Sequence, residues 1–389
     1  MKIPFKYMVK NFRTRRVSTL ITLAGIALVI FVFSAVLMMA NGVKKTLVAT
    51  GSPDNVVITR KGSNGEISSI IRGETQEVIS TLPYIAKTSD GSPEISYQPV
   101  VVITLGTPDG GLGNVTVRGV SQTTLYLHRG LEMIEGRMFN ASLREAIVGQ
   151  AIAKKYSEAR LGGSIKLAGD YWKIVGIFSN NGSGFESEIW CDYRQIQDAF
   201  HRGSSVSSVT LKLDSPSNFD KFKEAFSADR RLQEFVPKPE QQYFGEQSET
   251  LATFIKVVGT VITIVFSFGA AIGAMITMYA EVSNRTVEIG TLRALGFSRS
   301  SVLTVFLFEA ILISFAGGLL GIFLASALQF VSVTTMNFTS FSELTFSFAL
   351  SPASVVASLL FSVLMGFFGG FLPSTRAARL NIVSALRGG

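Results

Sequence analysis

The sequence predicts a membrane protein with four transmembrane α-helices, one and later three, and a large mixed α/β extracytoplasmic domain between the first helix and the second. Hydrophobic residues make up 47% of the chain and charged residues only 16%, a balance that is common in membrane proteins and unusual for a water-exposed surface. Four segments are long and apolar enough to cross a bilayer, which takes about 20 such residues. Between the first two, short β-type runs alternate with helical patterns, which is typical of a mixed α/β domain.

The predicted spans contain very few charges. The first and the last have none, the second contains only Lys256 near one end, and the third contains only Glu309. The first could also be a secretory signal, but its apolar run exceeds the roughly 7 to 15 residues of a signal core, which favours a retained helix. We place the four spans at 17–40, 251–280, 302–331 and 353–372.

The first sixteen residues have the pattern of an amphipathic helix. Phe5, Met8, Val9 and Phe12 recur at helical spacing, and four basic residues follow another side. Such a helix would lie in the inner-leaflet interface, in contact with membrane lipids. The alternative is a disordered basic start that only sets the topology.

The distribution of Lys and Arg predicts the orientation. Basic residues precede the first span, lie between the second and the third and follow the fourth, whereas the loop 332–352 contains neither Lys nor Arg. We therefore expect both termini, the segment 281–301 and the tail 373–389 in the cytoplasm. The segment 41–250 and the external loop 332–352 then lie on the other side of the membrane, as in a multi-pass protein.

The segment 41–250 is nearly neutral, with 23 Lys and Arg against 24 Asp and Glu, so the net charge of +8 comes from the cytoplasmic edges of the spans. That pattern indicates attraction to anionic lipids and no nucleic-acid partner. A single cysteine, Cys191, means that this domain folds without an internal disulfide. Strand-type runs cover 56–60, 99–105, 114–120, 172–178 and 207–213, and helical patterns cover 74–80, 146–156, 193–201 and 219–226.

Little in the sequence suggests catalysis. The two histidines, His128 and His201, have no Cys, Asp or Glu at metal-ligand spacing, and we interpret them as surface or core residues. Cys191 has no obvious basic neighbour that would lower its pKa, so we interpret it as a packing residue. The sequence contains no G-x-S-x-G, H-E-x-x-H or G-x-x-x-x-G-K-[ST] motif, and we predict a non-catalytic subunit with no cofactor or metal of its own.

Glu309 is the one acidic residue within the predicted spans, in the inner half of the third. An ionisable group inside a bilayer is a functional candidate by default. We favour a protonated or hydrogen-bonded carboxyl group that holds helix ends together over an ion relay, for which a lone carboxylate is poorly suited. The spans otherwise offer no polar pathway or selectivity ring, so a channel for a hydrophilic solute is not expected.

Small residues recur at helix-contact spacing in the last three spans. Because apolar burial does not drive helix association in lipid, small residues favour packing by letting backbones approach closely. We expect these helices to pack against one another or across a dimer. The candidate packing residues are Gly269 and Gly273 in the second span and Gly317 and Gly321 in the third.

The charged segment 281–301 between two apolar spans has the pattern of a short helix. Glu281 and Arg285 form an i, i+4 pair, and Arg285 and Glu288 an i, i+3 pair. Ile289, Leu292 and Leu295 would form a narrow apolar face. Gly296 is a plausible helix stop, and Ser298 can cap the helix that follows, so the sequence predicts a small rigid knob suited to docking into a partner.

Two stretches of sequence resemble FtsX-like permease domains, the membrane subunits of MacB-type ABC transporters. They are NRTVEIGTLRALGFSRSSVLTVFLFEAILISFAGGLLG at 284–321 and LPSTRAARLNIVSALRGG at 372–389. In the segment 41–250, the runs VRGV, EGRMF, EAIVGQAIAKKY, LGGSIKLAGDYWKIVGIF and EIWCDYRQI resemble the MacB-type periplasmic core domain. The resemblance covers nearly the whole chain, with 251–389 as the FtsX-like part.

The resemblance implies a dimer of permeases in the bacterial inner membrane, served by ABC ATPase subunits that would hold ATP and Mg on a separate chain. Spans one and two would then form a stalk that carries motion outward. The part from about Thr286 to Ala294 would match the family's coupling helix. The candidate coupling residues are Arg285, Thr286, Glu288, Ile289, Gly290, Leu292, Arg293, Ala294, Leu295 and Gly296.

Three functions are compatible with this resemblance. The leading hypothesis is export of a hydrophobic or amphipathic cargo through the extracytoplasmic domain, with a periplasmic adaptor and an outer-membrane channel as further candidate partners. The alternatives are regulation of a periplasmic cell-wall hydrolase and release of lipoproteins. The large domain at 41–250 favours transport over a simple regulator.

Overall fold

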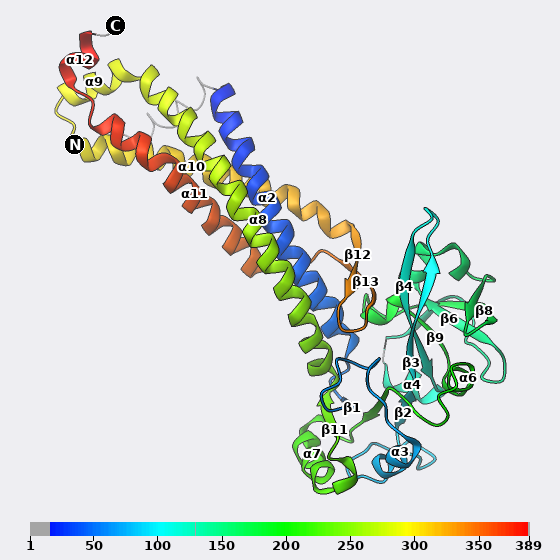
Figure 1. Ribbon diagram of the computed structural model, residues 1–389. Helices are drawn as coiled ribbons and strands as arrows, with labels where there is room; N and C mark the ends of the chain where they lie inside the picture. Colours follow the sequence, from blue (N-terminus) through cyan, green and yellow to red (C-terminus); the bar gives the residue numbers. More distant parts are fainter. Residues whose placement is uncertain (1–15, 129, 388–389) are drawn as a thin grey trace. The chain divides into compact units, whose positions relative to one another are not determined.

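The computed structural model describes residues 16–128 and 130–387, which form two compact units (Figure 1). The helical unit comprises Met1–Gly42, Thr253–Val331 and Phe348–Gly389, and the core domain comprises Val43–Ala252 and Ser332–Ser347. The amphipathic helix predicted at 1–16 lies outside the described residues except for Arg16, which begins the first long helix.

Four helices in the described part of the chain are long and apolar enough to cross a membrane, as predicted. They are α2 (Arg16–Thr50), α8 (Glu240–Asn284), α10 (Arg299–Ser326) and α11 (Pro352–Ala378). The short helices α9 (Thr286–Ala294) and α12 (Ile382–Arg387) complete the unit, with a 3₁₀ turn η5 (Ala327–Phe330) after α10. At about 1.5 Å per residue, the 45 residues of α8 extend roughly 67 Å, well beyond a hydrocarbon core of about 30 Å.

Glycines bring α10 close to its neighbours. A Cβ added to Gly321 would lie 2.6 Å from the carbonyl oxygen of Ala27 on α2, and one added to Gly317 would lie 3.0 Å from that of Leu23. Hydroxyl groups add contacts between helices, because Ser34 on α2 donates to Ser358 on α11 at 2.9 Å. Small residues therefore allow these backbones to approach, as the sequence predicts for the third span.

Gly269 and Gly273 on α8 do not pack against the other described helices of the same chain. No atom lies within 4 Å of a Cβ built at either position. The apolar side chains on the same stretch of α8, including Phe268, Ile272 and Ile276, are more than half exposed. Packing of α8 against the other described helices is therefore wrong for these two glycines, and only the dimer alternative stays as a prediction.

The core domain contains two large sheets, as the mixed α/β prediction requires (Figure 1). The four-stranded sheet has the order β11-β1-β10-β2 and is antiparallel throughout. Its strands are β1 (Asn55–Arg60), β2 (Ile95–Gln98), β10 (Ser208–Lys212) and β11 (Phe235–Pro239). An apolar core that includes Ile58, Ile79 and Phe222 joins this sheet to α3 (Gly73–Ser80) and α7 (Phe219–Ala228).

The second sheet has the order β3-β4-β9-β6-β8-β5, with β7 also paired to β8. The β4–β9 and β6–β8 pairs are parallel and the others antiparallel. The strands are β3 (Val100–Gly106), β4 (Leu112–Val120), β5 (Glu132–Gly136), β6 (Glu145–Gly149), β7 (Ser164–Leu167), β8 (Asp170–Ser179) and β9 (Glu188–Asp192). The helices on this part of the chain are α4 (Gln122–Leu127), α5 (Gln150–Lys155) and α6 (Tyr193–Ala199), with the 3₁₀ turns η1 (Ser157–Ala159) and η2 (Gly184–Ser187).

Two predictions for this region need correction. The helix predicted at 146–156 is half strand, because β6 occupies Glu145–Gly149 and only Gln150–Lys155 is helical. All five residues of β6 are buried between β8 and β9, and burial on both faces favours a strand. The external loop predicted at 332–352 contains a β-hairpin of β12 (Ser332–Asn337) and β13 (Ser342–Ser347), which belongs to the core domain.

Candidate functional site

A short helix bounded by two breaks connects the second and third membrane helices. The backbone leaves α8 at Arg285, with φ −110° and ψ 18°, before α9 begins at Thr286. At the other end Gly296 has φ +91°, a left-handed conformation that glycine adopts without strain. The N–H of Phe297 donates to the Leu292 carbonyl at 3.2 Å, which together with a Gly296 N–H bond to the Arg293 carbonyl at 3.1 Å forms a Schellman motif. Gly296 therefore ends α9 as predicted.

The side chains of the predicted apolar face of α9 are not all buried on one side of the helix. Ile289 is 1% exposed and belongs to an apolar cluster with Val302 and Phe306 of α10, and Gly290 is buried beside it. Leu295, in contrast, is 67% exposed. The outward face instead consists of Val287, Thr291, Ala294 and Leu295, which recur at helical spacing.

Arg285 anchors the start of α9 to the membrane helices on both sides. Its guanidinium Nη1 lies 3.2 Å from Glu309 Oε2 on α10 and 3.6 Å from Glu281 Oε1 on α8, and its Nε lies 3.1 Å from Glu288 Oε2. The side chains of Arg285 and Glu309 are only 4% and 2% exposed. The guanidinium also lies over the Phe306 ring, 4.8 Å from its centroid.

Glu309 is therefore paired with a cation. The structure favours the structural interpretation of this residue over an ion relay, because the carboxylate joins α10 to the start of α9. Loss of either partner would leave a buried charge with reduced compensation, which is costly in a low-dielectric environment. The joint makes the position of α9 depend on that of α10.

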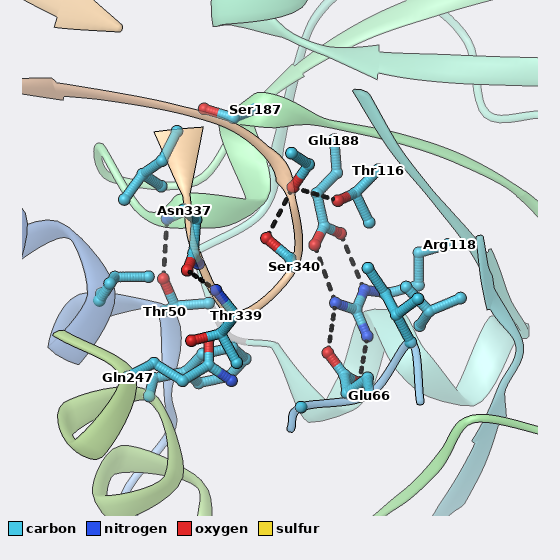
Figure 2. A pocket seen from close by; sticks show the side chains of 18 of the residues that line it. Thr50, Glu66, Thr116, Arg118, Ser187, Glu188, Gln247, Asn337, Thr339 and Ser340 are labelled. Atoms are coloured by element: carbon cyan, nitrogen blue, oxygen red, sulfur yellow. Dashed lines mark hydrogen bonds and ion pairs between the residues drawn. The ribbon is translucent and has the colours of Figure 1, made fainter. Parts of the chain in front are cut away.

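A second candidate site is a cavity of about 50 Å³ in the core domain, which Figure 2 shows from close by. Its wall combines the hairpin 332–347, strands β4 and β9 and the ends of α2 and α8 that belong to this domain. The lining is rich in hydroxyl and amide groups, among them Thr50, Thr116, Gln247 and Ser340. A space of this size holds only a few water molecules, roughly three to five, so it is too small for a cargo molecule.

Arg118 of β4 lies at one side of this cavity and is saturated with acceptors (Figure 2). Its Nε and Nη2 donate to Glu188 at 2.8 Å, its Nη1 and Nη2 donate to Glu66 at 2.7 and 2.9 Å, and its Nη1 also donates to Gln98 at 2.8 Å. All five N–H groups of the guanidinium are therefore used, and none is left to bind an anionic ligand.

The cluster around Arg118 is charged at neutral pH. Burial favours the neutral form of Glu66, but the Arg118 guanidinium outweighs burial, and the pKa of Glu66 is lowered. Burial likewise favours neutral Arg118, yet Glu188 and Glu66 raise its pKa well above the usual value. Because Gln98 and Arg118 lie on different sheets, this cluster joins the two sheets of the core domain.

The buried environments of His128 and Cys191 indicate structural roles for both residues. His128 is buried against the Phe185 ring, 4.6 Å between centroids, and burial together with Arg118 lowers its pKa to about 3. It is therefore a neutral imidazole at neutral pH. Burial raises the pKa of Cys191, which keeps the thiol protonated and unreactive. No cluster of three or more His, Cys, Asp or Glu side chains suited to a metal occurs among the described residues.

Sequence reasoning missed the Arg118 cluster and the docked hairpin. The available signal for the first was a charged residue in the middle of the apolar strand run NVTVRGV, because a cation within a buried strand needs a partner. The signal for the second was the polar alternation in SVTTMN and SELTFS.

The sequence matches two families of known proteins. Residues 19–229 match the MacB-like periplasmic core domain, and residues 260–382 match the FtsX-like permease C-terminal domain. Together these two matches account for the core domain and the membrane helices in the order found in the chain.

Curated relatives match across nearly the whole chain. The macrolide export ATP-binding/permease protein MacB of Pectobacterium atrosepticum is 25% identical over 98% of this chain and 60% of its own length. The protein of the same name from Bartonella henselae is 25% identical over 95% of this chain and 57% of its own length. The chain thus spans about 60% of the length of these relatives.

Two solved structures align with about half of this chain. The periplasmic region of MacB from Actinobacillus actinomycetemcomitans aligns over 50% of this chain and 92% of its own, with 13% identity and a TM-score of 0.38. The extracellular domain of the transporter YknZ from Gram-positive bacteria aligns over 47% of this chain and 99% of its own, with 14% identity and a TM-score of 0.37.

Proposed function

Because the chain belongs to the family defined by the MacB-like periplasmic core domain, followed by an FtsX-like permease domain, we propose that it is the membrane subunit of an ABC transporter. ATP hydrolysis by a separate ATPase subunit, which holds ATP and Mg, drives a conformational change in the core domain. The observation that carries this proposal is α9, a short helix with an outward face and a buried ion pair to α10. Such a helix can receive force from a partner and pass it to the membrane helices.

The proposed orientation places α9 and both termini in the cytoplasm and the core domain outside. It rests on the Lys and Arg residues that precede the first span, lie between the second and third and follow the fourth, while the loop 332–352 has none. A cysteine introduced at Leu295, which is 67% exposed, should react with a membrane-impermeant maleimide only in inside-out vesicles. A cysteine at Leu112 on the core domain, which is 79% exposed, should react only in right-side-out vesicles. Reaction of both from the same side would contradict the proposed topology.

We propose that the cargo is hydrophobic or amphipathic and that the core domain, with an adaptor and an outer-membrane channel as further partners, moves it outward. The small free volume between the described helices supports a route through the core domain and not through the helices of one chain. The cavity bordered by Thr22, Thr277 and Ser314 amounts to about 10 Å³, which admits no cargo within a single chain. Relatives named for macrolide export make export the leading direction.

Copurification tests the proposal. The full chain should be purified in detergent from its native membrane, and the retained proteins and small molecules identified by mass spectrometry. We expect an ABC ATPase whose hydrolysis rate in lipid nanodiscs rises when the chain is present. Absence of any ATPase would contradict the coupling role. An ATPase together with a cell-wall hydrolase and no adaptor would replace export with regulation of that hydrolase.

A further inference from the structure

The hairpin 332–347 connects the third and fourth membrane helices, yet it folds as part of the core domain. Its strands pair in register from Ser332 with Ser347 to Asn337 with Ser342. The chain therefore passes between the helical unit and the core domain four times, twice through the continuous helices α2 and α8 and twice at the ends of this hairpin.

Main-chain and hydroxyl groups attach the hairpin to β4 and η2. Thr116 Oγ1 donates to Ser342 Oγ at 2.7 Å, and Asn114 Nδ2 donates to the Phe341 carbonyl at 3.1 Å. The N–H of Thr345 donates to Ser187 Oγ at 2.9 Å. These contacts lie at the start of β13 and at Thr345, two residues before its end.

Glu343, the second residue of β13, adds a charged contact. It is the only charged residue of the segment 332–352. Its Oε2 accepts hydrogen bonds from Lys155 Nζ at 2.6 Å and from Tyr156 OH at 2.7 Å. A Cβ at Gly113 would lie 2.6 Å from Glu343 Oε1, so the glycine leaves room for this carboxylate.

Apolar burial accompanies these polar contacts. Leu344 and Phe346 of β13 are only 4% and 2% exposed, while Glu343 is 18% exposed. Burial of two large apolar side chains contributes several kcal/mol, which a transient contact would not provide. The hairpin is therefore attached by hydrogen bonds, an ion pair and apolar packing together.

We propose that the hairpin 332–347 is a permanent anchor that holds the outer ends of the third and fourth membrane helices to the core domain in every state of the transport cycle. Motion of these helices then reaches the core domain directly, in addition to the route through α2 and α8. Glu343 is the positioning residue of this anchor. The attachment stands on its own contacts, and only its role during ATP hydrolysis rests on the proposed function.

A disulfide tests the attachment in the full-length protein. With Thr116→Cys and Ser342→Cys, the two sulfur atoms replace hydroxyl oxygens that lie 2.7 Å apart, within reach of a bond after a small shift. The native Cys191 is buried and does not compete. We expect near-complete cross-linking in ATP-free membranes. The control pair Thr116→Cys and Ser332→Cys should not cross-link, because Ser332 is five strand residues, roughly 17 Å, from Asn337, which pairs with Ser342.

The same disulfide tests permanence when the copurified ATPase is present. We expect equal cross-linking yields without nucleotide and with ATP plus vanadate, and equal ATPase rates before and after reduction. A yield that falls with ATP and vanadate, or a rate that rises several-fold on reduction, would overturn the proposal. Failure to obtain a stimulated ATPase would instead count against the proposed function, and the ATP-free result would still decide the attachment.

Charge reversal provides a second variant. Glu343→Lys places two ammonium groups together and should reduce the Thr116–Ser342 cross-link by more than half, while Lys155→Glu in the same chain should restore it. Asp170→Lys is the matched control, because it reverses a charge in the exposed Arg144–Asp170 pair of the core domain and should leave the yield unchanged. Equal yields in Glu343→Lys and in the parent would overturn the role of Glu343.

Discussion

Arg285 and Glu309 form a buried ion pair, 3.2 Å between Nη1 and Oε2, that joins the start of α9 to the middle of a membrane helix. The two residues are 24 positions apart and lie on opposite sides of the α9 turn. In a protein moved by a partner at α9, this buried pair links the start of α9 to α10. It is therefore the first contact to test.

Glu309→Gln should weaken this joint. Arg285 would keep its ion pairs with Glu281 and Glu288, so we expect the free energy of unfolding to fall by about 3 kcal/mol or less. We also expect a clear loss of ATPase stimulation, while membrane insertion stays unchanged. Glu234→Gln is the matched control, because it removes a carboxylate from the exposed Arg60–Glu234 pair of the core domain, which contributes about 1 kcal/mol at most. Equal stimulation by the parent and Glu309→Gln would rule out a role for the pair in coupling.

Leu295→Glu should abolish binding of the ATPase without disturbing the fold. The side chain is 67% exposed on the outward face of α9, so the charge costs little in the isolated subunit but opposes burial in a docking groove. The control is Leu112→Glu on the core domain, which is 79% exposed. The measurement is the amount of ATPase that copurifies, and retention of the ATPase by Leu295→Glu would exclude this face as the docking surface.

Gly269→Cys should form a disulfide between two copies of the chain if α8 lies at the dimer interface. The position faces open space in the single chain, next to exposed apolar side chains, so a second copy or lipid must cover it. Ser358→Cys is the internal control, because the side chain at that position is buried and contacts Ser34 on α2 of its own chain. A monomer-only band for Gly269→Cys in oxidised native membranes would place lipid, and not a second copy, against this face.

Glu66→Gln should destabilise the core domain at neutral pH. The pKa of Glu66 is lowered from 4.5 in the folded protein, so its contribution is present above about pH 4.5 and is lost as the pH falls through the folded value. The stability difference between parent and variant should therefore shrink below that pH. Both tryptophans, Trp172 and Trp190, are buried in the core domain, so their fluorescence follows its unfolding in the full-length protein. If the stability difference between the parent and Glu66→Gln stayed constant down to pH 3, the lowered pKa of Glu66 would be refuted.

Hydrophobicity and short-range patterns were sufficient for much of this architecture. The four spans could be predicted because each is a run of apolar residues long enough to cross a membrane. The end of α9 at Gly296 could be predicted because it depends on a local backbone conformation. The strand runs near 56–60 and 114–120 also contain enough β-branched residues to be identified without tertiary contacts.

Features that depend on distant partners were not predictable from a single sequence. The run at 146–156 has helical spacing, but β6 becomes a strand because β8 and β9 bury it on both sides. Ile289 turns inward because α9 folds back on α10, and nothing within the segment 281–301 indicates that contact. Glu309 was recognised as important, but its partner Arg285 became evident only when the turn brought them together.

The saturated guanidinium of Arg118 has a consequence for how the core domain can respond. Its five donors bind residues from both sheets, so neither sheet can slide past the other without exposing buried charges. A conformational change driven in this domain would then move the two sheets together and leave the segments around them to rearrange. A protein bound to the sheets would respond to their displacement.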